Sequence, residues 1–317
     1  MTAKKTYLIT GGAGFIGSHL AACCLERGHG VRVLDDLRTG LESNLEGLDL
    51  EFLRGDIREE RTVREAVKGV AGVFHLAALP SVPRSIKDPW TSHDVNVNGT
   101  LRVLLAAREE GAKVVFAGSS SAYGDTEELP KREEMAARPQ SPYAASKVAG
   151  ENYVRVFARV FGMPNVVVRY FNVFGPRQRA DSPYSGVIAK FCRAALEGEV
   201  CRIDGDGGQS RDFTYVEDAA RGTYLAMERD VPGGEVLNLA GGNRYSLLQL
   251  LEALSDLVGK EIPREFGDPR PGDVRHSQAE VSKAEELLGF RTRVDFREGL
   301  GRTLDWYRSK RPAHSGS

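Results

Sequence analysis

The stretch "TYLITGGAGFIGSHL", residues 6–20, decides the fold class of this chain. It opens with a short apolar run ended by glycines, which predicts a buried strand. Gly11, Gly14 and Gly17 then form a G-x-x-G-x-x-G pattern at the start of a predicted helix over residues 14–28. Glycines here permit a tight turn and let backbone N–H groups approach a diphosphate at the helix N-terminus. The pattern is informative because it lies between a predicted strand and a predicted helix.

The strand–helix alternation continues along the first half of the chain. Further strands are predicted at residues 31–36, 50–56, 72–78, 113–119 and 165–171, and further helices at residues 62–69, 100–111 and 142–162. Such alternation favours a parallel sheet with helices on both faces. We therefore expect an α/β protein in which residues 1–175, with a returning segment near residues 212–240, form a Rossmann-type doubly wound parallel sheet. Shorter elements with more prolines and glycines predict a smaller α/β lobe, mainly residues 176–317.

The composition argues against several classes of function. The chain has 317 residues and a formal net charge of −1, so no basic excess favours nucleic acid or an anionic membrane. The four cysteines, Cys23, Cys24, Cys192 and Cys201, lack the spacing of metal ligands, and we expect free thiols and no metal site. No apolar run approaches the roughly 18 residues that span a bilayer, and the first residues do not resemble a signal peptide. We therefore expect a soluble cytoplasmic protein.

Three acidic residues follow the next two predicted strands. Asp35 lies at the end of the first of them, where a carboxylate can accept hydrogen bonds from a ribose diol. The same carboxylate would repel the additional phosphate of NADP, and we identify no basic residue at that strand end, so NAD is the expected cofactor. Asp36 could share this role or take it over. Asp56 could meet the adenine amino group or cap the next helix, and the sequence leaves both open.

A tyrosine and a lysine stand four residues apart in "SPYAASK", residues 141–147. On one helix, Tyr143 and Lys147 share a face. The Lys147 ammonium, with the positive nicotinamide ring of NAD⁺, would lower the pKa of the phenol and make it a general base. Ser119 ends a predicted strand, where ligands of open α/β sheets bind, and its hydroxyl could relay a proton. The pair is also common on ordinary helices, so its meaning depends on this context.

Together these motifs resemble the extended short-chain dehydrogenase/reductase family, and within it the nucleotide-sugar 4-epimerases. The resemblance covers about residues 5–308 and rests on "TGGAGFIG", "YAASK", "RYFNVFGP" and "SRDFTYVEDA". The chain is most similar to UDP-N-acetylglucosamine 4-epimerases, through "AALPSVPRSIKDP" at residues 77–89 and "GDVRHSQAEVSKAEELLGF" at residues 272–290. The resemblance implies a resident NAD, a UDP-sugar substrate bound by the smaller lobe, and a homodimer that pairs the helices at residues 100–111 and 142–162.

The resemblance also implies roles for individual residues. Tyr143 would be the catalytic base, Lys147 its partner and Ser119 the serine nearest the sugar 4-hydroxyl. Asn172, Arg211 and Arg270 would hold the diphosphate, and Asp273 the uridine ribose. The implied cofactor contacts are Gly11, Gly14, Phe15, Ile16, Gly17, Asp35, Asp36, Asp56, Ile57, Ala77, Asn96, Tyr143 and Lys147. The implied substrate contacts are Ser81, Arg84, Ser85, Ser120, Ser121, Asn172, Arg211, Arg270, Asp273 and Ser277.

The implied reaction is a redox-neutral inversion at C4, most specifically between UDP-GlcNAc and UDP-GalNAc, with UDP-glucose and UDP-galactose also accepted. Ser277 stands where 4-epimerases restricted to unacetylated sugars have a tyrosine, which would leave room for an acetamide. Arg84 leaves a uronate substrate open, because a guanidinium suits a carboxylate. A 4,6-dehydratase is disfavoured because Ser120 and Ser121 replace its Asp-Glu pair. A UDP-uronate decarboxylase and a non-catalytic NAD-binding scaffold remain weaker alternatives.

Overall fold

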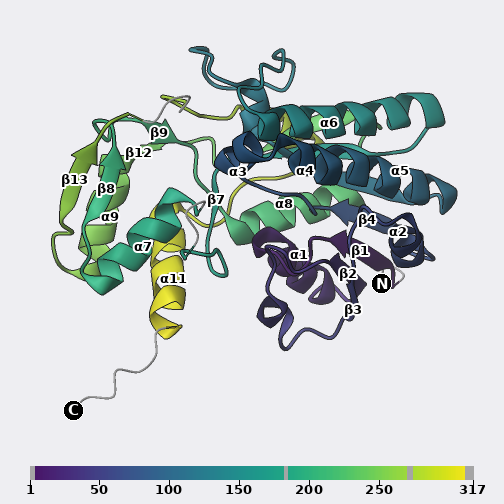
Figure 1. The fold of residues 1–317 in the computed structure, drawn as a ribbon, viewed down its shortest axis with the longest axis horizontal. Helices are drawn as coiled ribbons and strands as arrows, with labels where there is room; N and C mark the ends of the chain where they lie inside the picture. The colour runs from purple at the N-terminus through teal and green to yellow at the C-terminus, as the bar shows by residue number, and fades with distance from the viewer. Residues whose placement is uncertain (1–3, 182–184, 270–273, 311–317) are drawn as a thin grey trace.

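The centre of the larger lobe is a parallel sheet. The protein is seen here as a computed structural model, which describes residues 4–181, 185–269 and 274–310. Within these residues the sheet has seven strands in the order β11-β6-β5-β4-β1-β2-β3, all neighbours parallel (Figure 1). The strands are β1 (Thr6–Thr10), β2 (Gly30–Asp35), β3 (Glu51–Arg54), β4 (Gly72–His75), β5 (Lys113–Ser119), β6 (Val166–Tyr170) and β11 (Glu235–Leu239). The predicted fold class is confirmed.

Helices cover both faces of this sheet. One face carries α1 (Phe15–Leu25), α8 (Val216–Glu228) and α10 (Ser282–Leu288). The other carries α2 (Glu60–Val67), α5 (Thr100–Glu109) and α6 (Pro142–Phe161). Figure 1 shows α1 and α8 side by side, although they lie far apart in the sequence. Each face has its own cluster of buried apolar side chains, which explains why the strands are apolar throughout instead of alternating.

The connection from β4 to α5 is more structured than the sequence pattern predicts. It contains α3 (Val82–Lys87), α4 (Pro89–His93) and a π-helical turn, η2 (Asp94–Gly99). The two short helices start at side-chain caps, because Ser81 accepts a hydrogen bond from the Arg84 N–H and Asp88 accepts one from the Thr91 N–H. These elements are too short to show a helical period in the sequence, so the pattern analysis missed them.

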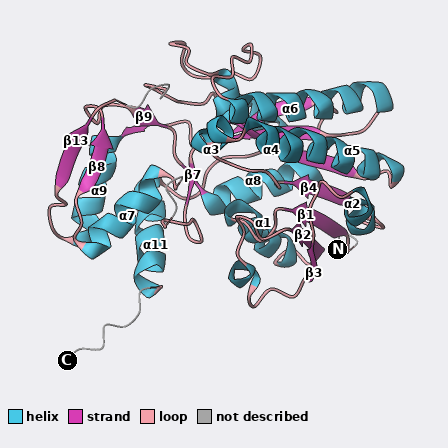
Figure 2. Cartoon of the chain, in the orientation of Figure 1, coloured by secondary structure: helices cyan, strands magenta, loops and turns pink. Residues whose placement is uncertain are grey.

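The smaller lobe is built from three helices and short strand pairs. The helices are α7 (Val187–Glu197), α9 (Leu247–Val258) and α11 (Phe296–Ser309), and Figure 2 shows them beside β8 (Cys201–Asp204) and β13 (Arg264–Gly267). The other pairs are β7 (Val173–Phe174) with β10 (Thr214–Tyr215), and β9 (Ser210–Arg211) with β12 (Tyr245–Ser246). In the larger lobe, 3₁₀ turns are formed by η1 (Glu42–Leu45) and η3 (Ser120–Tyr123). The smaller lobe has a separate apolar core, while the exact domain boundaries stay a prediction.

The outer face of α6 is unusually apolar for an exposed helix surface. Val156, Val160 and Phe161 are 51%, 64% and 46% exposed. An arginine of α5, Arg108, covers the Phe161 ring at 4.6 Å. Among the described helices, none is both long and apolar enough to cross a membrane. The apolar strip on α6 is therefore a feature that packing within this chain does not explain.

Candidate active site

The glycine turn after β1 is closed so tightly that side chains are excluded. Gly11 has φ +72°, and a Cβ there would lie 2.7 Å from the backbone nitrogen of Ala77. A Cβ at Gly17 would lie 2.3 Å from the carbonyl oxygen of Gly11. Helix α1 begins directly after this turn and has no acidic residue in its first turn. Its free N–H groups and positive dipole end can therefore receive an anion.

A cavity of about 630 Å³ runs along the carboxyl ends of the strands from this turn. It reaches the start of α6, where Tyr143 and Lys147 line it. Of the residues predicted to contact cofactor or substrate, the cavity wall contains Gly11, Gly14, Phe15, Ile16, Gly17, Asp35, Asp36, Asp56, Ile57, Ala77, Ser81, Arg84, Tyr143 and Lys147. The tertiary structure thus brings together the glycine turn, the acidic strand ends and the Tyr/Lys pair.

Asp35 is held in place by backbone groups at the end of β2. Its carboxylate accepts hydrogen bonds from the N–H of Ala13, at 3.0 Å, and of Leu37, at 2.9 Å. The side chain is buried, and this burial raises the pKa of the carboxyl, although the two N–H donors oppose the rise. Leu37 has a left-handed backbone, φ +60°, which is strained for a bulky residue. The turn after β2 is therefore shaped to present Asp35 to the cavity.

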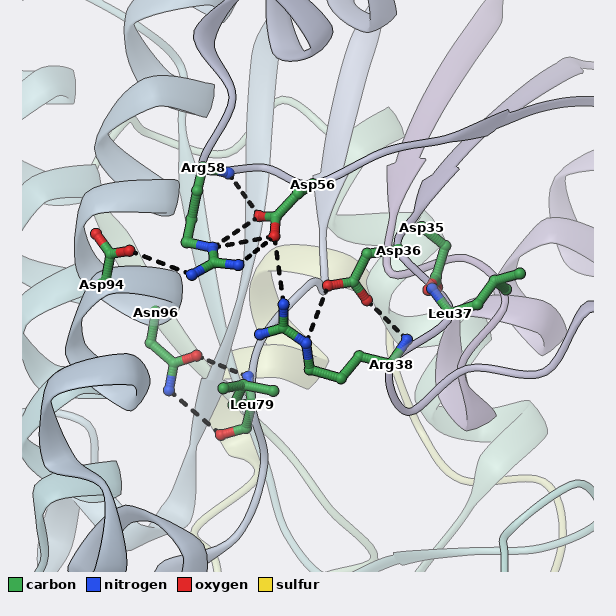
Figure 3. Close-up of polar contacts among 9 residues, drawn as sticks. All are labelled: Asp35, Asp36, Leu37, Arg38, Asp56, Arg58, Leu79, Asp94 and Asn96. Carbon is green, nitrogen blue, oxygen red and sulfur yellow. Dashed lines mark hydrogen bonds and ion pairs between the residues drawn. The ribbon is translucent and has the colours of Figure 1, made fainter.

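A chain of ion pairs surrounds this end of the cavity. Figure 3 shows Arg38 between Asp36 and Asp56, at 3.6 and 3.5 Å, and Arg58 between Asp56 and Asp94, at 2.6 and 3.5 Å. Arg38 lines the cavity, so the expectation of no basic residue at this strand end was wrong. The two arginines form ion pairs with Asp36 and Asp56. Among these three acids, Asp35 has no ion pair with a cation of the described residues.

The surroundings of Asp56 exclude one of its two predicted roles, which is to cap the next helix. Its carboxylate bonds the Arg58 side chain and accepts the Arg58 N–H at 2.8 Å. The N-cap of α2 is Glu59, so Asp56 does not cap that helix. Because Asp56 lines the cavity, contact with an adenine stays a prediction.

Asn96 lies in the π-helical turn η2 and is fully engaged within the protein. Its side-chain oxygen accepts the Leu79 N–H at 2.8 Å, and its amide donates to the Ser146 hydroxyl at 2.9 Å. Figure 3 shows the amide facing Leu79, and the residue is 2% exposed. Asn96 therefore joins the cavity wall to α6 and supports the site, while a direct contact with the cofactor stays a prediction. Extra residues inserted as π-helical turns often serve functional sites in this way.

Helix α6 begins in the position that its sequence predicts. Ser141 caps it by accepting the Ala144 N–H at 3.1 Å, and Pro142 is the first helical residue. This start sets Tyr143 and Lys147 on one face above β5. The Lys147 ammonium donates to the Ala117 carbonyl at 3.0 Å, and burial lowers the pKa of Lys147 to about 8.

Tyr143 and Ser119 meet at the end of β5. Burial raises the pKa of the Tyr143 phenol, and a hydrogen bond with Ser119 partly opposes that rise. Lys147 was expected to lower the pKa of Tyr143, but in the protein alone the pKa of Tyr143 is raised and Lys147 is not among the causes of its shift. The contribution of a nicotinamide ring remains a prediction. What the structure shows is a half-buried phenol beside a serine hydroxyl, which is the arrangement a proton transfer requires.

The neighbouring serines differ in what they can reach. The Ser119 and Ser121 hydroxyls lie 2.8 Å apart in the η3 turn, and Ser120 and Ser121 are half-buried. Ser85 is different, because it is fully buried and its hydroxyl accepts the Tyr143 N–H at 3.0 Å and donates to the Val82 carbonyl. We therefore correct the prediction that Ser85 contacts substrate, since its hydroxyl instead positions the first turn of α6.

The predicted substrate residues of the smaller lobe lie along two adjacent segments. Asn172 has a strained backbone, φ +34°, and donates to the Asp212 carbonyl at 3.1 Å. Ser277 donates its backbone N–H to the Ser210 carbonyl at 3.0 Å, beside Arg211. This aligns residues 276–279 with residues 210–212, next to the strand end that carries Asn172. Arg270 and Asp273 lie outside the described residues, so their roles stay predictions.

Several cavity residues were not predicted from the sequence. Tyr170 ends β6, and Arg177, Gln178 and Arg179 lie in the loop beyond it; all four line the cavity. The other additions include Arg38, Thr39, Asn44, Leu79, Pro80 and Ser185. The run "GPRQR", two residues after the "YFN" motif, was the available sign for three of them, because residues just beyond a strand end tend to reach ligands.

The model of the family described as "NAD dependent epimerase/dehydratase family" matches residues 7–240, which include the glycine turn and the Tyr/Lys pair. The chain belongs to this family. A UDP-glucose 4-epimerase of Mycolicibacterium smegmatis is 38% identical over 96% of this chain and 98% of its own length.

Solved structures of this epimerase/dehydratase family agree with the fold. A UDP-N-acetylglucosamine 4-epimerase from Methanobrevibacter ruminantium M1 is 37% identical, with a TM-score of 0.93 over 97% of this chain and 99% of its own. A Thermus thermophilus UDP-glucose 4-epimerase, solved in complex with NAD, is 37% identical, with a TM-score of 0.89 over 96% and 99% of the two chains. The predicted family is thus confirmed. A UDP-GlcNAc 4-epimerase is also among the proteins to which this chain is similar, as expected.

NAD is the cofactor of this epimerase/dehydratase, and the described residues suit it. The glycine turn is a cradle that any Cβ would fill, at the positive end of α1. Asp35 would receive the adenosine ribose, and Lys147 and Tyr143 would stand at the nicotinamide end. When bound, NAD would accept a hydride from the substrate and return it.

Proposed function

We propose that this protein is a UDP-sugar 4-epimerase that interconverts UDP-GlcNAc and UDP-GalNAc. The observation that carries the proposal is that Tyr143 and Lys147 line the cofactor cavity together, with the Tyr143 phenol beside Ser119 and Lys147 anchored on the Ala117 carbonyl. Such a pair could take a proton from a sugar 4-hydroxyl while bound NAD⁺ would take the hydride of C4. The hydride would then return to the other face of C4 and the proton to the carbonyl oxygen of the 4-keto sugar, which inverts C4 with no net oxidation.

Each residue would have a defined part in this cycle. Ser119 would bond the 4-hydroxyl and share its proton with Tyr143. Lys147, fixed on the Ala117 carbonyl, would favour the phenolate once the proton has been taken. Asn172 and Arg211 would hold the diphosphate, so that the sugar could turn about its phosphate linkage while the nucleotide stays in place.

Ser277 supports the proposal that the substrate is an acetylated sugar nucleotide. Its backbone bond to Ser210 places a small side chain beside the segment that carries Arg211. Ala279, two residues on, packs with Tyr123 and Phe171, which flank the serine turn and Asn172. A serine in this position would leave space for a C2 acetamide in both orientations of the sugar.

Two other substrates deserve a test because relatives of similar identity use them. A UDP-glucuronate 4-epimerase of Thermodesulfobacterium geofontis is 35% identical, and a UDP-N-acetyl-alpha-D-glucosaminuronate decarboxylase of Bacillus cytotoxicus is 34% identical. Arg84 lines the cavity and could pair with a sugar carboxylate. Ser120 and Ser121 disfavour a dehydratase, since neither can act as a carboxylic acid or base.

A panel of UDP-sugars followed by proton NMR tests the proposal. UDP-GlcNAc, UDP-glucose and UDP-glucuronate are each incubated with the protein, and the C4 configuration of the product is read from its ring couplings. We expect UDP-GlcNAc to yield UDP-GalNAc at the highest kcat/KM. Inversion of UDP-glucuronate alone would shift the function to a uronate epimerase, release of carbon dioxide would shift it to a decarboxylase, and no turnover of any sugar would favour a non-catalytic protein.

A further inference from the structure

Arg177 lies in the loop after β6, on the wall of the cofactor cavity. The same cavity is lined by Phe15, Ile16 and Gly17 from the glycine turn and the first turn of α1. His19, on the next turn of α1, donates from Nε2 to the Pro176 carbonyl at 2.9 Å. This bond ties the loop to the helix whose N-terminus forms the anion site, so Arg177 is held near that site.

The backbone of Arg177 is kept in a conformation that costs free energy. Its φ is +67°, in the left-handed region that an arginine rarely adopts. Gly175, two residues earlier, has φ +150°, and a Cβ there would lie 2.4 Å from Val216, so the loop has little freedom to relax. Strain of this kind persists where the surrounding structure imposes it, and it clusters at ligand sites.

One nitrogen of the Arg177 guanidinium is buried without a partner among the described residues. Within the described residues its Nη1 is buried and has no hydrogen-bond partner, and burial lowers the pKa of the side chain. Neighbouring Arg179, in contrast, pairs with Asp181 at 2.8 Å. His19 beside Arg177 cannot serve as a counter-ion, because burial lowers the pKa of its imidazole to about 4 and keeps it neutral. A buried donor of this kind is expected to face an anionic ligand.

The cavity wall carries charges of both signs. Asp35, Asp36 and Asp56 line it, and Arg38 and Arg58 already pair with the last two. The positive N-terminus of α1, Arg177 and Lys147 line the same cavity. A dinucleotide presents ribose hydroxyls and an amino group at one end and two negative phosphates in the middle. The cavity wall thus offers acids for the hydroxyls and positive groups for the phosphates.

We propose that Arg177 binds the diphosphate of the dinucleotide cofactor, opposite the backbone N–H groups of the glycine turn. A guanidinium presents N–H donors in a planar fork that suits two phosphate oxygens. The cofactor diphosphate would thus be held from both sides, by α1 below and by the loop after β6 above. The inference rests on NAD as the cofactor and does not depend on which sugar is turned over.

The test compares Arg177→Gln with a matched arginine variant. Arg102, on α5, also has a buried Nη1 without a partner but does not line the cavity, so Arg102→Gln is the control. The full chain is freed of dinucleotide, and calorimetric titration gives Kd for NAD, ADP-ribose, adenosine and UDP. Melting curves with and without NAD report folding and ligand stabilisation in the same samples.

The proposal predicts a pattern across ligands. In Arg177→Gln, affinity for NAD and ADP-ribose should fall roughly 10- to 100-fold, while adenosine and UDP bind as in the wild type. The melting temperature without ligand should not fall, and the increase caused by NAD should shrink. Arg177→Lys should recover part of the affinity, and Arg102→Gln should change none of these values.

Three results would overturn the proposal. An NAD affinity within threefold of the wild type would show that Arg177 makes no such contact. A loss confined to UDP would assign the guanidinium to the substrate diphosphate. An equal loss for adenosine would mean that the effect does not pass through the diphosphate. None of these measurements involves sugar turnover, so the proposal for Arg177 can fail without contradicting the proposed epimerase activity, and the reverse also holds.

Discussion

The ammonium of Lys147 lies 3.0 Å from the carbonyl oxygen of Ala117, two residues before Ser119 on the same strand. This bond joins α6 to β5 where the Tyr143 phenol meets Ser119. Because the lysine is anchored to the backbone, its charge is held near the phenol instead of moving with a flexible side chain. The three proposed catalytic side chains are thus positioned by one helix and one strand, which hold side chains more precisely than loops do.

Tyr143→Phe should lower kcat by about 10²- to 10⁴-fold, because the variant keeps the ring but loses the proposed general base. NAD binding should remain, since the ring shape is unchanged. Tyr153→Phe, on the exposed side of the same helix, is the control and should keep wild-type activity. Turnover of UDP-GlcNAc and calorimetric NAD binding measure both effects. A Tyr143→Phe enzyme with most of its kcat would move the base to Ser119 or another group.

The purified protein should carry NAD or NADH and not NADP, because the Asp35 carboxylate repels a 2′-phosphate. Asp35→Asn should weaken NAD binding and strengthen NADP binding, since the carboxylate that would repel the additional phosphate is gone while Arg38 still lines the cavity. Adding Arg38→Gln should cancel the gain for NADP. Nucleotide released on denaturation identifies the bound form, and titrations give both affinities. Predominant NADP in the wild type would contradict the role of Asp35.

Ser277→Tyr should remove activity on UDP-GlcNAc and UDP-GalNAc while sparing UDP-glucose, because the larger ring would occupy the space of the acetamide. Ser282→Tyr, at an exposed serine five residues on, controls for adding a tyrosine to this region. The quantity to compare is the ratio of kcat/KM for the acetylated and plain sugars. If the variant keeps the wild-type value for UDP-GlcNAc, selectivity lies elsewhere, with Ser81 and Arg84 as the next candidates.

We expect a homodimer that buries the apolar strip on α6. Val160→Glu places a charge in the middle of this strip, where the valine is 64% exposed. It should shift the protein from dimer to monomer, as measured by light scattering at working concentration. Val200→Glu, at a valine of the smaller lobe that is 51% exposed, should leave the dimer intact. A monomeric wild type would show that this strip is not a dimer contact.

Acid should destabilise the fold through His75. Its ring is bonded by the Thr10 and Thr100 hydroxyls at 2.7 and 2.9 Å, and burial lowers its pKa to about 3. As the pH falls below about 6.5, His75 therefore binds a proton in the unfolded chain but stays neutral in the folded protein. The folded state loses stability relative to the unfolded chain progressively toward pH 3. The free energy of unfolding should thus fall with decreasing pH, by up to about 1.4 kcal/mol per pH unit from this group.

Urea unfolding between pH 4.5 and 7 measures this slope in the wild type and in His75→Gln. The variant should be less stable at pH 7 but should show a flatter pH dependence, because the buried titrating group is gone. His93→Gln, at an exposed histidine, serves as the control for the substitution itself. Identical slopes in the wild type and His75→Gln would contradict a lowered pKa at this position.

The limits of sequence reasoning are clearest between β4 and α5. The sequence did not show how Asn96 supports the site, because it is a π-helical turn that directs its amide to Leu79 and Ser146. Ser85 was predicted to contact substrate, but a short helix buries it under α6. Neither element has a periodic pattern long enough to recognise, and a one-residue change in the helical turn redirects a side chain completely.

The sequence by itself determined the sheet, the glycine turn and the start of α6. These features depend on local rules: the period of apolar residues, the conformations open only to glycine, and the cap formed by Ser141 and Pro142. Only the tertiary structure decided which charges are paired and which are left alone. Arg38 and Arg177 look alike in the sequence, yet Arg38 lies between two carboxylates, whereas Nη1 of Arg177 is buried and has no hydrogen-bond partner among the described residues. Burial and long-range contacts set the energy of a charge, and both arise from segments that the linear order keeps apart.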